Sequence, residues 1–121
     1  MLRGSDKATD SLVQRQVGLV DYKLRVALWS LFAAIAEVGD DPTPSMDNLI
    51  VVMQAKRAVA EEAVSACDVI LDAAGGIAYS RRAGLEQSVR DVRGIVFHPF
   101  TPEKTLVHTS RVVLDQPSAE V

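Results

Sequence analysis

The sequence is poor in cysteine and in aromatic residues, and each shortage excludes a class of protein. Cys67 is the only cysteine, so an internal disulfide is impossible and disulfide-rich secreted scaffolds are excluded. Its place in an apolar helical pattern predicts a small buried hydrophobe. Aromatic residues make up 5% of a chain that is 48% hydrophobic, so alanine and valine supply much of the apolar content. That balance favours closely packed helices over a β-sandwich.

The chain also lacks a strong excess of one charge and a long apolar run. Its formal net charge is -3 and no basic stripe dominates, which argues against a nucleic-acid partner. The longest nearly apolar run, Val26 to Ala36, is much shorter than the ~20 residues of a membrane span. The polar N-terminal residues contain no apolar core of a signal peptide. We therefore expect a cytoplasmic protein that binds neither nucleic acid nor membrane.

Two long segments carry apolar residues at helical spacing, within a length of 121 residues that suits one domain. The first helix is expected to begin at Asp10 or Ser11 and to end at Gly39. The second is expected from Met46 to Ala74, with Ser45 as its N-cap. The residues between them, 40–44, contain two prolines and form a loop. Because this loop is short, the two helices should pack antiparallel.

Particular side chains in these helices invite predictions of their own. Trp29 and Phe32 widen the apolar stripe of the first helix, which predicts that this helix is covered on more than one side. Lys56 falls on the apolar stripe of the second helix. A lysine that extends its ammonium group to solvent is favoured there over a functional amine.

Two shorter helices are predicted in the C-terminal part of the chain. Gly75-Gly76 ends the second long helix, and Gly84-Leu85 starts a third that runs to about Val96. Thr101 caps a fourth helix to about Leu114, with Pro102 at its first position and Glu103 favourable for the helix dipole. The predicted fold is all-α, an antiparallel up-down bundle of two long and two shorter helices. It occupies residues 11–114, between a flexible lead-in over 1–10 and a loose tail over 115–121.

The sequence contains no metal-ligand spacing, P-loop, nucleophile elbow or dinucleotide glycine motif. Gly75-Gly76 is by itself explained by a helix end, although paired glycines also let a backbone approach a ligand closely. The helix start at Thr101 offers a place for an anion. Joined by one short helix, these two elements would suit a bulky phosphorylated cofactor. Arg90-Asp91 fits an internal ion pair as well as it fits a ligand contact.

The C-terminal part of the sequence contains an ordered set of motifs: Gly75-Gly76-x-x-Tyr79, Leu85-Glu86, Arg90-Asp91-Val92-Arg93 and Thr101-Pro102-Glu103. This ordered set resembles the C-terminal helical domain of the acyl-CoA dehydrogenase superfamily over residues 12–114. The segment Val96-Phe97-His98-Pro99 is similar to the more divergent acyl-CoA dehydrogenase-like and flavin monooxygenase-like members.

The resemblance implies a helical bundle that builds a dimer and tetramer core. It also implies FAD as cofactor, with Gly75, Gly76, Thr101 and Glu103 as the flavin contacts. The Gly-Gly turn would approach the pyrophosphate and adenosine of a neighbouring subunit's FAD, and the threonine-capped helix the FAD of its own subunit. Asp72 stands where many members carry a glutamine that holds FAD, and its carboxylate would face an anionic cofactor.

Departures from the family pattern limit the implied activity. Pro99 occupies the position of the catalytic glutamate in many members and cannot act as a base. The family's N-terminal helical domain and middle β-domain have no counterpart in this sequence. The resemblance therefore implies an acyl-CoA dehydrogenase-like oxidoreductase only when a partner chain, such as a larger acyl-CoA dehydrogenase-like subunit, or the missing domains complete the site.

Three interpretations remain open from the sequence. The first is this incomplete, homo-oligomeric flavoprotein chain. The second is a non-enzymatic helical oligomerisation or regulatory module derived from the same family. The third is a monooxygenase-type component in which His98 donates a proton or orients a reactant. The simpler interpretation of His98 is a loop histidine that caps the preceding helix.

Overall fold

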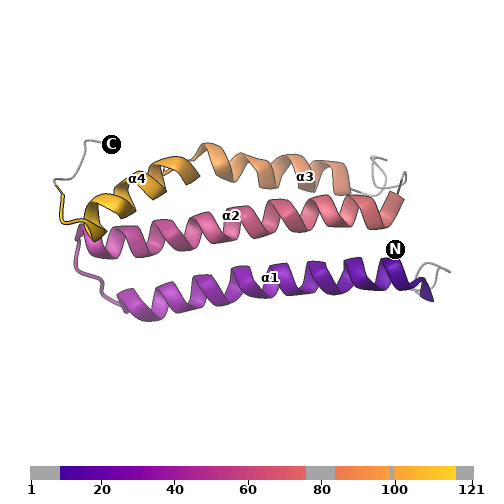
Figure 1. Cartoon of the computed structure of the whole chain (residues 1–121), viewed down its shortest axis with the longest axis horizontal. Coiled ribbons are helices and arrows are strands. Elements are labelled where there is room, and N and C mark those ends of the chain that lie inside the picture. The colour runs from indigo at the N-terminus through magenta and orange to yellow at the C-terminus, as the bar shows by residue number, and fades with distance from the viewer. Residues whose placement is uncertain (1–8, 76–83, 99, 117–121) are drawn as a thin grey trace.

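The structure is a computed structural model that describes residues 9–75, 84–98 and 100–116. These residues form the helices α1 (Ser11–Val38), α2 (Met46–Ala74), α3 (Leu85–Arg93) and α4 (Pro102–Val113), with a short 3₁₀ helix η4 (Gly94–Phe97) after α3. The long helices α1 and α2 pack antiparallel, and α3 and α4 follow one another back along α2 (Figure 1). The predicted two long and two shorter helices are confirmed, and the described residues contain no strand.

The ends of the long helices lie where the capping residues predict them. Asp10 accepts hydrogen bonds through Oδ1 from the backbone N–H groups of Leu12 at 2.8 Å and Val13 at 3.1 Å. Ser45 Oγ accepts from the N–H of Asn48 at 3.1 Å. These contacts satisfy N–H groups that have no partner within the helix. Gly39 ends α1 with φ 80°, a conformation that residues with a side chain rarely adopt.

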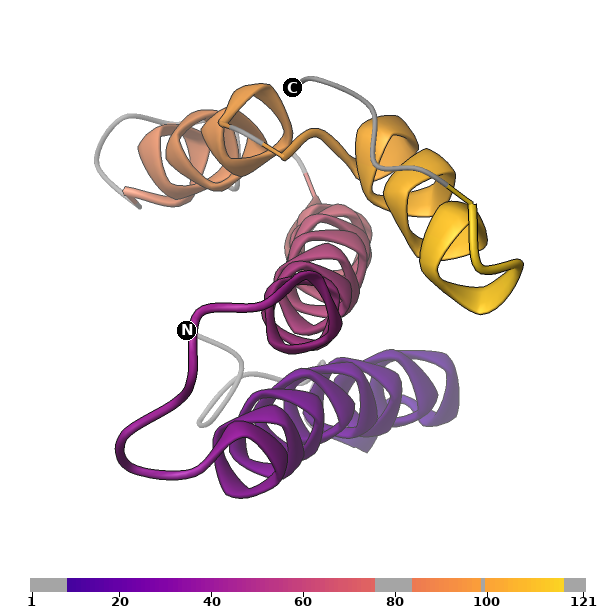
Figure 2. The same ribbon diagram turned by 90° about the vertical axis from the view of Figure 1, so that its left-hand side faces the viewer.

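The helices form three layers with α2 in the middle. Figure 2 shows α1 on one side of α2, and α3 and α4 on the opposite side. Seven of the nine buried hydrophobic residues among those described are alanines, which lets neighbouring helix backbones approach closely. The buried hydrophobic residues are Ala27, Ala34, Ile50, Ala55, Ala60, Ala66, Ala73, Ala74 and Phe100.

Helix α1 differs from its prediction because only one of its sides is covered. Trp29 and Phe32, expected to contact a second layer, are each 62% exposed. Within the described residues, α2 is the only helix that packs extensively against α1. The buried residues of α1 are Ala27 and Ala34, whereas the larger residues Leu24, Leu31 and Ile35 of the predicted apolar stripe are 40–51% exposed, so the stripe did not identify the side that packs on α2.

The third helix is shorter than predicted. Its α-helical part ends at Arg93, and the chain tightens into η4 before reaching His98. His98 adopts an extended conformation, with φ -82° and ψ 142°. A proline disfavours the helical conformation of the residue before it, so Pro99 in the sequence accounts for the extended conformation of His98. The α-helical part ends where the sequence places Gly94, a residue of low helix propensity.

No described helix combines the length and the hydropathy needed to span a lipid bilayer.

Candidate functional site

The start of α4 is a fully formed helix cap centred on Thr101. The Thr101 Oγ1 accepts a hydrogen bond from the Lys104 N–H at 3.3 Å, and Pro102 occupies the first turn. The Thr101 carbonyl accepts from the backbone N–H of Thr105 at 3.0 Å and from Thr105 Oγ1 at 3.1 Å. Glu103 is exposed in the same turn, where a carboxylate complements the helix dipole. The prediction that Thr101, Pro102 and Glu103 begin this helix is confirmed.

Helix α2 holds the segment before α4 in place through two side chains. The Lys56 ammonium group donates hydrogen bonds to the carbonyl oxygens of His98 at 2.7 Å and Phe100 at 3.3 Å. The Met53 sulfur lies 3.5 Å from the backbone nitrogen of Phe100 and accepts its N–H. Lys56 therefore connects the two layers. The prediction that Lys56 extends its ammonium group to solvent is therefore wrong, because the group binds two backbone carbonyls.

An aromatic pair fills the space behind the Thr101 cap. Phe100 and His108 stack with ring centroids 4.5 Å apart and an angle of 14° between the planes. Both residues are buried, and Thr105 between them in sequence is only 2% exposed. Among the described residues, the His108 Nδ1 atom has no hydrogen-bond partner. Sequence reasoning missed this pair, because His108 is polar and the apolar residues beside it, Leu106 and Val107, are exposed.

Gly75 ends α2 as predicted. Its φ is 70°, and its N–H donates to the Leu71 carbonyl. Asp72, one turn earlier, is exposed. The other residues of the predicted glycine turn, Gly76 and Tyr79, lie outside the described residues.

The two predicted contact points, Gly75 and Thr101, do not meet within one chain. Pro102, next to Thr101, lines a shallow hollow together with Val64 and other residues in the middle of α2. Gly75 stands eleven residues beyond Val64, which corresponds to roughly 15–20 Å along a helix. In one chain these two helix ends are therefore separated along α2 and do not share one contact point. The resemblance assigned these ends to flavins of two different subunits, and that assignment stays a prediction.

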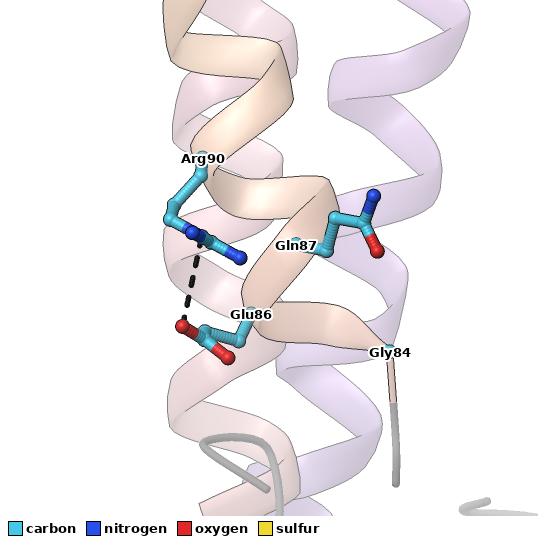
Figure 3. A pocket seen from close by; sticks show the side chains of 4 residues that line it. All are labelled: Gly84, Glu86, Gln87 and Arg90. Atoms are coloured by element: carbon cyan, nitrogen blue, oxygen red, sulfur yellow. Dashed lines mark ion pairs between the residues drawn. The ribbon is translucent and has the colours of Figure 1, made fainter. Parts of the chain in front are cut away.

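A polar hollow lies at the start of α3 (Figure 3). It measures about 410 Å³, and its described lining residues are Gly84, Glu86, Gln87 and Arg90. The Arg90 Nε atom lies 3.6 Å from Glu86 Oε1, one helical turn away. Arg90 therefore pairs with Glu86 rather than with the neighbouring Asp91.

The second arginine of this motif has a structural role. The Arg93 guanidinium group binds Asp68 of α2 at 2.6 Å and so fastens α3 to the middle layer. Arg90, by contrast, keeps an exposed side chain at the hollow. A ligand contact by Arg90 consequently remains a prediction, whereas Arg93 is engaged within the chain.

The weak catalytic candidate His98 follows η4 and is exposed to solvent. Its backbone N–H donates to the Ile95 carbonyl at 3.4 Å, and its own carbonyl accepts from Lys56. The described hydrogen bonds of His98 thus involve its backbone only, and the bond to Ile95 lies at the end of η4. Pro99, at the position of the family's catalytic glutamate, lies outside the described residues.

Cys67 is half-buried rather than buried. Burial is the main cause that raises the pKa of its thiol, and the Asp68 carboxylate raises it further, while Arg93 opposes the change. A raised pKa keeps the thiol protonated and weakly nucleophilic.

Within the described ranges, no group of histidine, cysteine and carboxylate side chains is placed to hold a metal ion. Comparisons with protein-family models, curated proteins and solved structures gave no match to this chain. Any assignment of function therefore depends on the geometry above and on the ordered motifs in the sequence.

Proposed function

We propose that this chain serves as the C-terminal helical domain of an acyl-CoA dehydrogenase-like FAD flavoprotein. It contributes helix ends to flavin binding and a surface to an oligomer, and it is incomplete as an enzyme by itself. Gly75, Gly76, Thr101 and Glu103 are the proposed flavin contacts.

One observation carries this proposal: the motifs that resemble the family fall on helix ends. Gly75 ends α2 with a positive φ, and Thr101 begins α4 with its hydroxyl in the cap. Lys56 and Met53 fix the backbone just before Thr101, so the start of α4 is held on the middle helix. A fixed helix start offers backbone dipoles that favour an anionic group without reorganisation.

The residues of this sequence do not by themselves complete the chemistry of the proposed enzyme. A base for removing an α-proton from an acyl thioester is not available at Pro99, because proline has no ionisable side chain. The flavin-binding and acyl-CoA-binding domains of the family likewise have no counterpart in this sequence. The proposed partner is therefore a larger subunit of the same family that supplies these parts.

Flavin absorbance tests the proposal directly. The chain is purified alone and together with a candidate larger subunit, and the visible absorbance band of bound flavin is read after gel filtration. We expect flavin only with the mixture. Stoichiometric FAD on the isolated chain would refute the need for a partner.

A substitution at Thr101 separates cofactor binding from folding. Thr101→Asp keeps a good N-cap but places a carboxylate where the cofactor's anionic groups are proposed to lie. We expect flavin retention by the mixed complex to fall by about tenfold or more, with an unchanged melting temperature. Thr101→Ser, which keeps the cap without adding charge, is the matched control. Equal retention by both variants would exclude Thr101 as a flavin contact.

The second candidate function is a non-enzymatic oligomerisation or regulatory module. The exposed apolar residues of α1 favour this function. Trp29 and Phe32 are each 62% exposed, and neither residue belongs to the motifs proposed to contact flavin. This function predicts that Thr101→Asp leaves flavin retention by the mixed complex unchanged, and that substitutions at Gly75 change assembly or stability only. If Thr101→Asp lowers the flavin content of the mixed complex while the oligomeric state of the complex stays the same, the result supports the flavoprotein function.

The monooxygenase-type function involving His98 is testable in the same mixture. Its exposed side chain is compatible with a reactant nearby. If His98→Ala leaves oxidation of reduced flavin by the mixed complex unchanged, this function has no remaining support.

A further inference from the structure

The imidazole of His108 is a buried titratable group that the proposed flavin site does not use. His108 is 4% exposed, and it lies in α4 together with the buried Thr105. An ordinary histidine changes its charge between about pH 5 and pH 8. When the ring is protonated, both of its nitrogens carry hydrogens, and each N–H group then needs an acceptor. The surroundings of His108 therefore decide whether the buried ring tolerates a proton.

The Nδ1 atom of His108 has no acceptor within the part of the chain that the structure describes. The atom is shielded from solvent and lacks a hydrogen-bond partner there. The Phe100 ring is nearly parallel to it, at 4.5 Å between centroids and 14° between planes. An N–H group lies in the plane of its own ring, so a ring stacked above that plane cannot accept from it. The Phe100 face attracts a cation, but an unsatisfied charged donor costs more than such a contact contributes.

On α4 itself, the charged side chains next to His108 are cations. Lys104 stands four residues before His108 and Arg111 three residues after it, and residues at these spacings are neighbours on a helix. Glu103, five residues before His108, is exposed in the first turn. A third positive charge between Lys104 and Arg111 is unfavourable.

Helix α2, against which α4 packs, has its carboxylates engaged in ion pairs over the stretch that contacts this layer. This stretch runs from Met53 to Val64. Its charged residues are Lys56, Arg57, Glu61 and Glu62. Glu61 pairs with Arg57 at 2.8 Å, and Glu62 pairs with Lys23 of α1 at 3.7 Å. Lys56 adds a positive charge, which binds the Phe100 carbonyl beside the stacked rings.

Phe100 connects the His108 ring to the attachment of α4. The backbone N–H of Phe100 donates to the Met53 sulfur at 3.5 Å, and its carbonyl accepts from Lys56 at 3.3 Å. If the His108 ring leaves the stack to reach water, Phe100 loses its cover. The contacts that hold the start of α4 on α2 then weaken together. The layer thus has a docked state with a neutral stacked ring and an undocked state that can hydrate a charged ring.

From these observations we propose that His108 is an acid-sensitive switch that controls the docking of α4 on α2. While the ring is neutral, it stacks on Phe100 and α4 stays docked. Protonation favours the undocked state, because only that state supplies an acceptor, in the form of water, for the Nδ1–H group. Docking is therefore most stable above the range in which imidazole titrates, and it weakens as the pH falls through that range. This switch does not rest on the proposed function and needs no flavin.

The first experiment measures amide hydrogen exchange of the full chain without flavin at about pH 7.5 and about pH 5.5, with the intrinsic pH dependence of exchange divided out. We expect the protection of α4 to fall by about tenfold or more at the lower pH, while that of α1 changes by less than about twofold. His108→Gln should remove this difference. His98→Gln is the matched control, because His98 is exposed and the sequence contains only these two histidines. Constant protection of α4 in the wild type, an equal fall in His108→Gln, or an equal fall in α1 would overturn the proposal.

The second experiment needs no substitution of His108. The ring signals of both histidines and the backbone amide signals of α4 are followed by NMR as the pH is lowered. We expect the α4 signals to change with the midpoint at which the His108 ring titrates. Signals of α4 that follow His98, or that change only at the lower pH where carboxylates titrate, would overturn the proposal. Flavin is absent from both experiments, so their failure is distinct from a failure of the flavin proposal.

Discussion

At the scale of single residues, the cap at Thr101 illustrates how one hydroxyl defines a helix start. Its side chain is used within the chain to accept from the Lys104 N–H. A ligand near α4 would therefore meet the helix dipole and backbone groups rather than a free threonine hydroxyl.

Replacing Thr101 by valine should destabilise the chain. The valine keeps the shape of the side chain but cannot accept the hydrogen bond at 3.3 Å. We expect the free energy of unfolding in urea to fall by about 1 kcal/mol. Thr101→Ser should leave it nearly unchanged, and a similar loss in both variants would contradict the role of the hydroxyl.

The Cys67 thiol should react slowly with iodoacetamide near neutral pH. Burial and the Asp68 carboxylate raise its pKa, while Arg93 lowers it. Asp68→Asn removes a cause that raises the pKa and frees Arg93 from its ion pair, so the pH profile of alkylation should move to lower pH. An unchanged profile, or one moved to higher pH, would show that Asp68 does not act on the thiol.

The same raised pKa has a consequence for stability. The folded chain holds the thiol proton more tightly than the unfolded chain does. Its contribution to stability is therefore complete below the ordinary thiol pKa and is lost as the pH rises through the raised value.

At the scale of helices, Lys56 decides how the C-terminal layer is attached. The ammonium group on α2 reaches the His98 and Phe100 carbonyls, which precede α4. Hydrogen bonds from a charged donor are stronger than those between neutral groups. The position of α4 thus depends on a side chain far away in the sequence.

Lys56→Met should loosen α4 without unfolding α1. Losing the two charged hydrogen bonds should weaken docking of the C-terminal layer by about 1.5–3 kcal/mol. We expect amide hydrogen exchange to become faster by about tenfold or more in α4 and to stay unchanged in α1. Lys104→Met, at an exposed lysine of α4, is the control. Faster exchange throughout the chain would contradict this local role.

The helices could be predicted from the sequence because their ends are encoded locally. Asp10, Ser45 and Thr101 cap N-termini through contacts with residues two or three positions later. Gly39 and Gly75 end helices through conformations that glycine adopts readily. Such short-range chemistry does not depend on the rest of the fold.

The contacts of Lys56 and the exposure of the apolar side of α1 could not be predicted from short-range chemistry. The carbonyls that Lys56 binds are more than forty residues away, so its position on an apolar stripe gave no sign of them. Likewise, periodicity shows which side of a helix is apolar but not what covers it. Of the candidate flavin contacts, Gly75 ends α2, and Thr101 and Glu103 begin α4, while the binding of any of them to a cofactor stays a prediction.

At the scale of the whole molecule, the core is small and built mainly from alanine. Larger apolar side chains, among them Leu28, Trp29 and Phe32, remain exposed. Burying them between two copies would add apolar contact that one copy lacks. Folding and association of this chain are therefore expected to be linked.

The melting temperature should accordingly rise with protein concentration. If the chain dimerises through α1, a tenfold increase in concentration should raise it by about 3–6 °C. The melting temperature of Leu28→Glu should not change over the same range of protein concentration. Calorimetry of both proteins checks this, and a wild-type melting temperature independent of concentration would show that folding is not linked to association.

The central place of α2 in Figure 2 has a consequence for how substitutions combine. Helices α1 and α4 lie on opposite sides of α2 and share no extensive contact among the described residues. Ala27→Gly in α1 and Thr101→Val before α4 should therefore have additive effects, with a coupling energy below about 0.5 kcal/mol in a double-mutant cycle. A larger coupling would mean that α2 shifts as a rigid rod between its neighbours and transmits strain from one to the other.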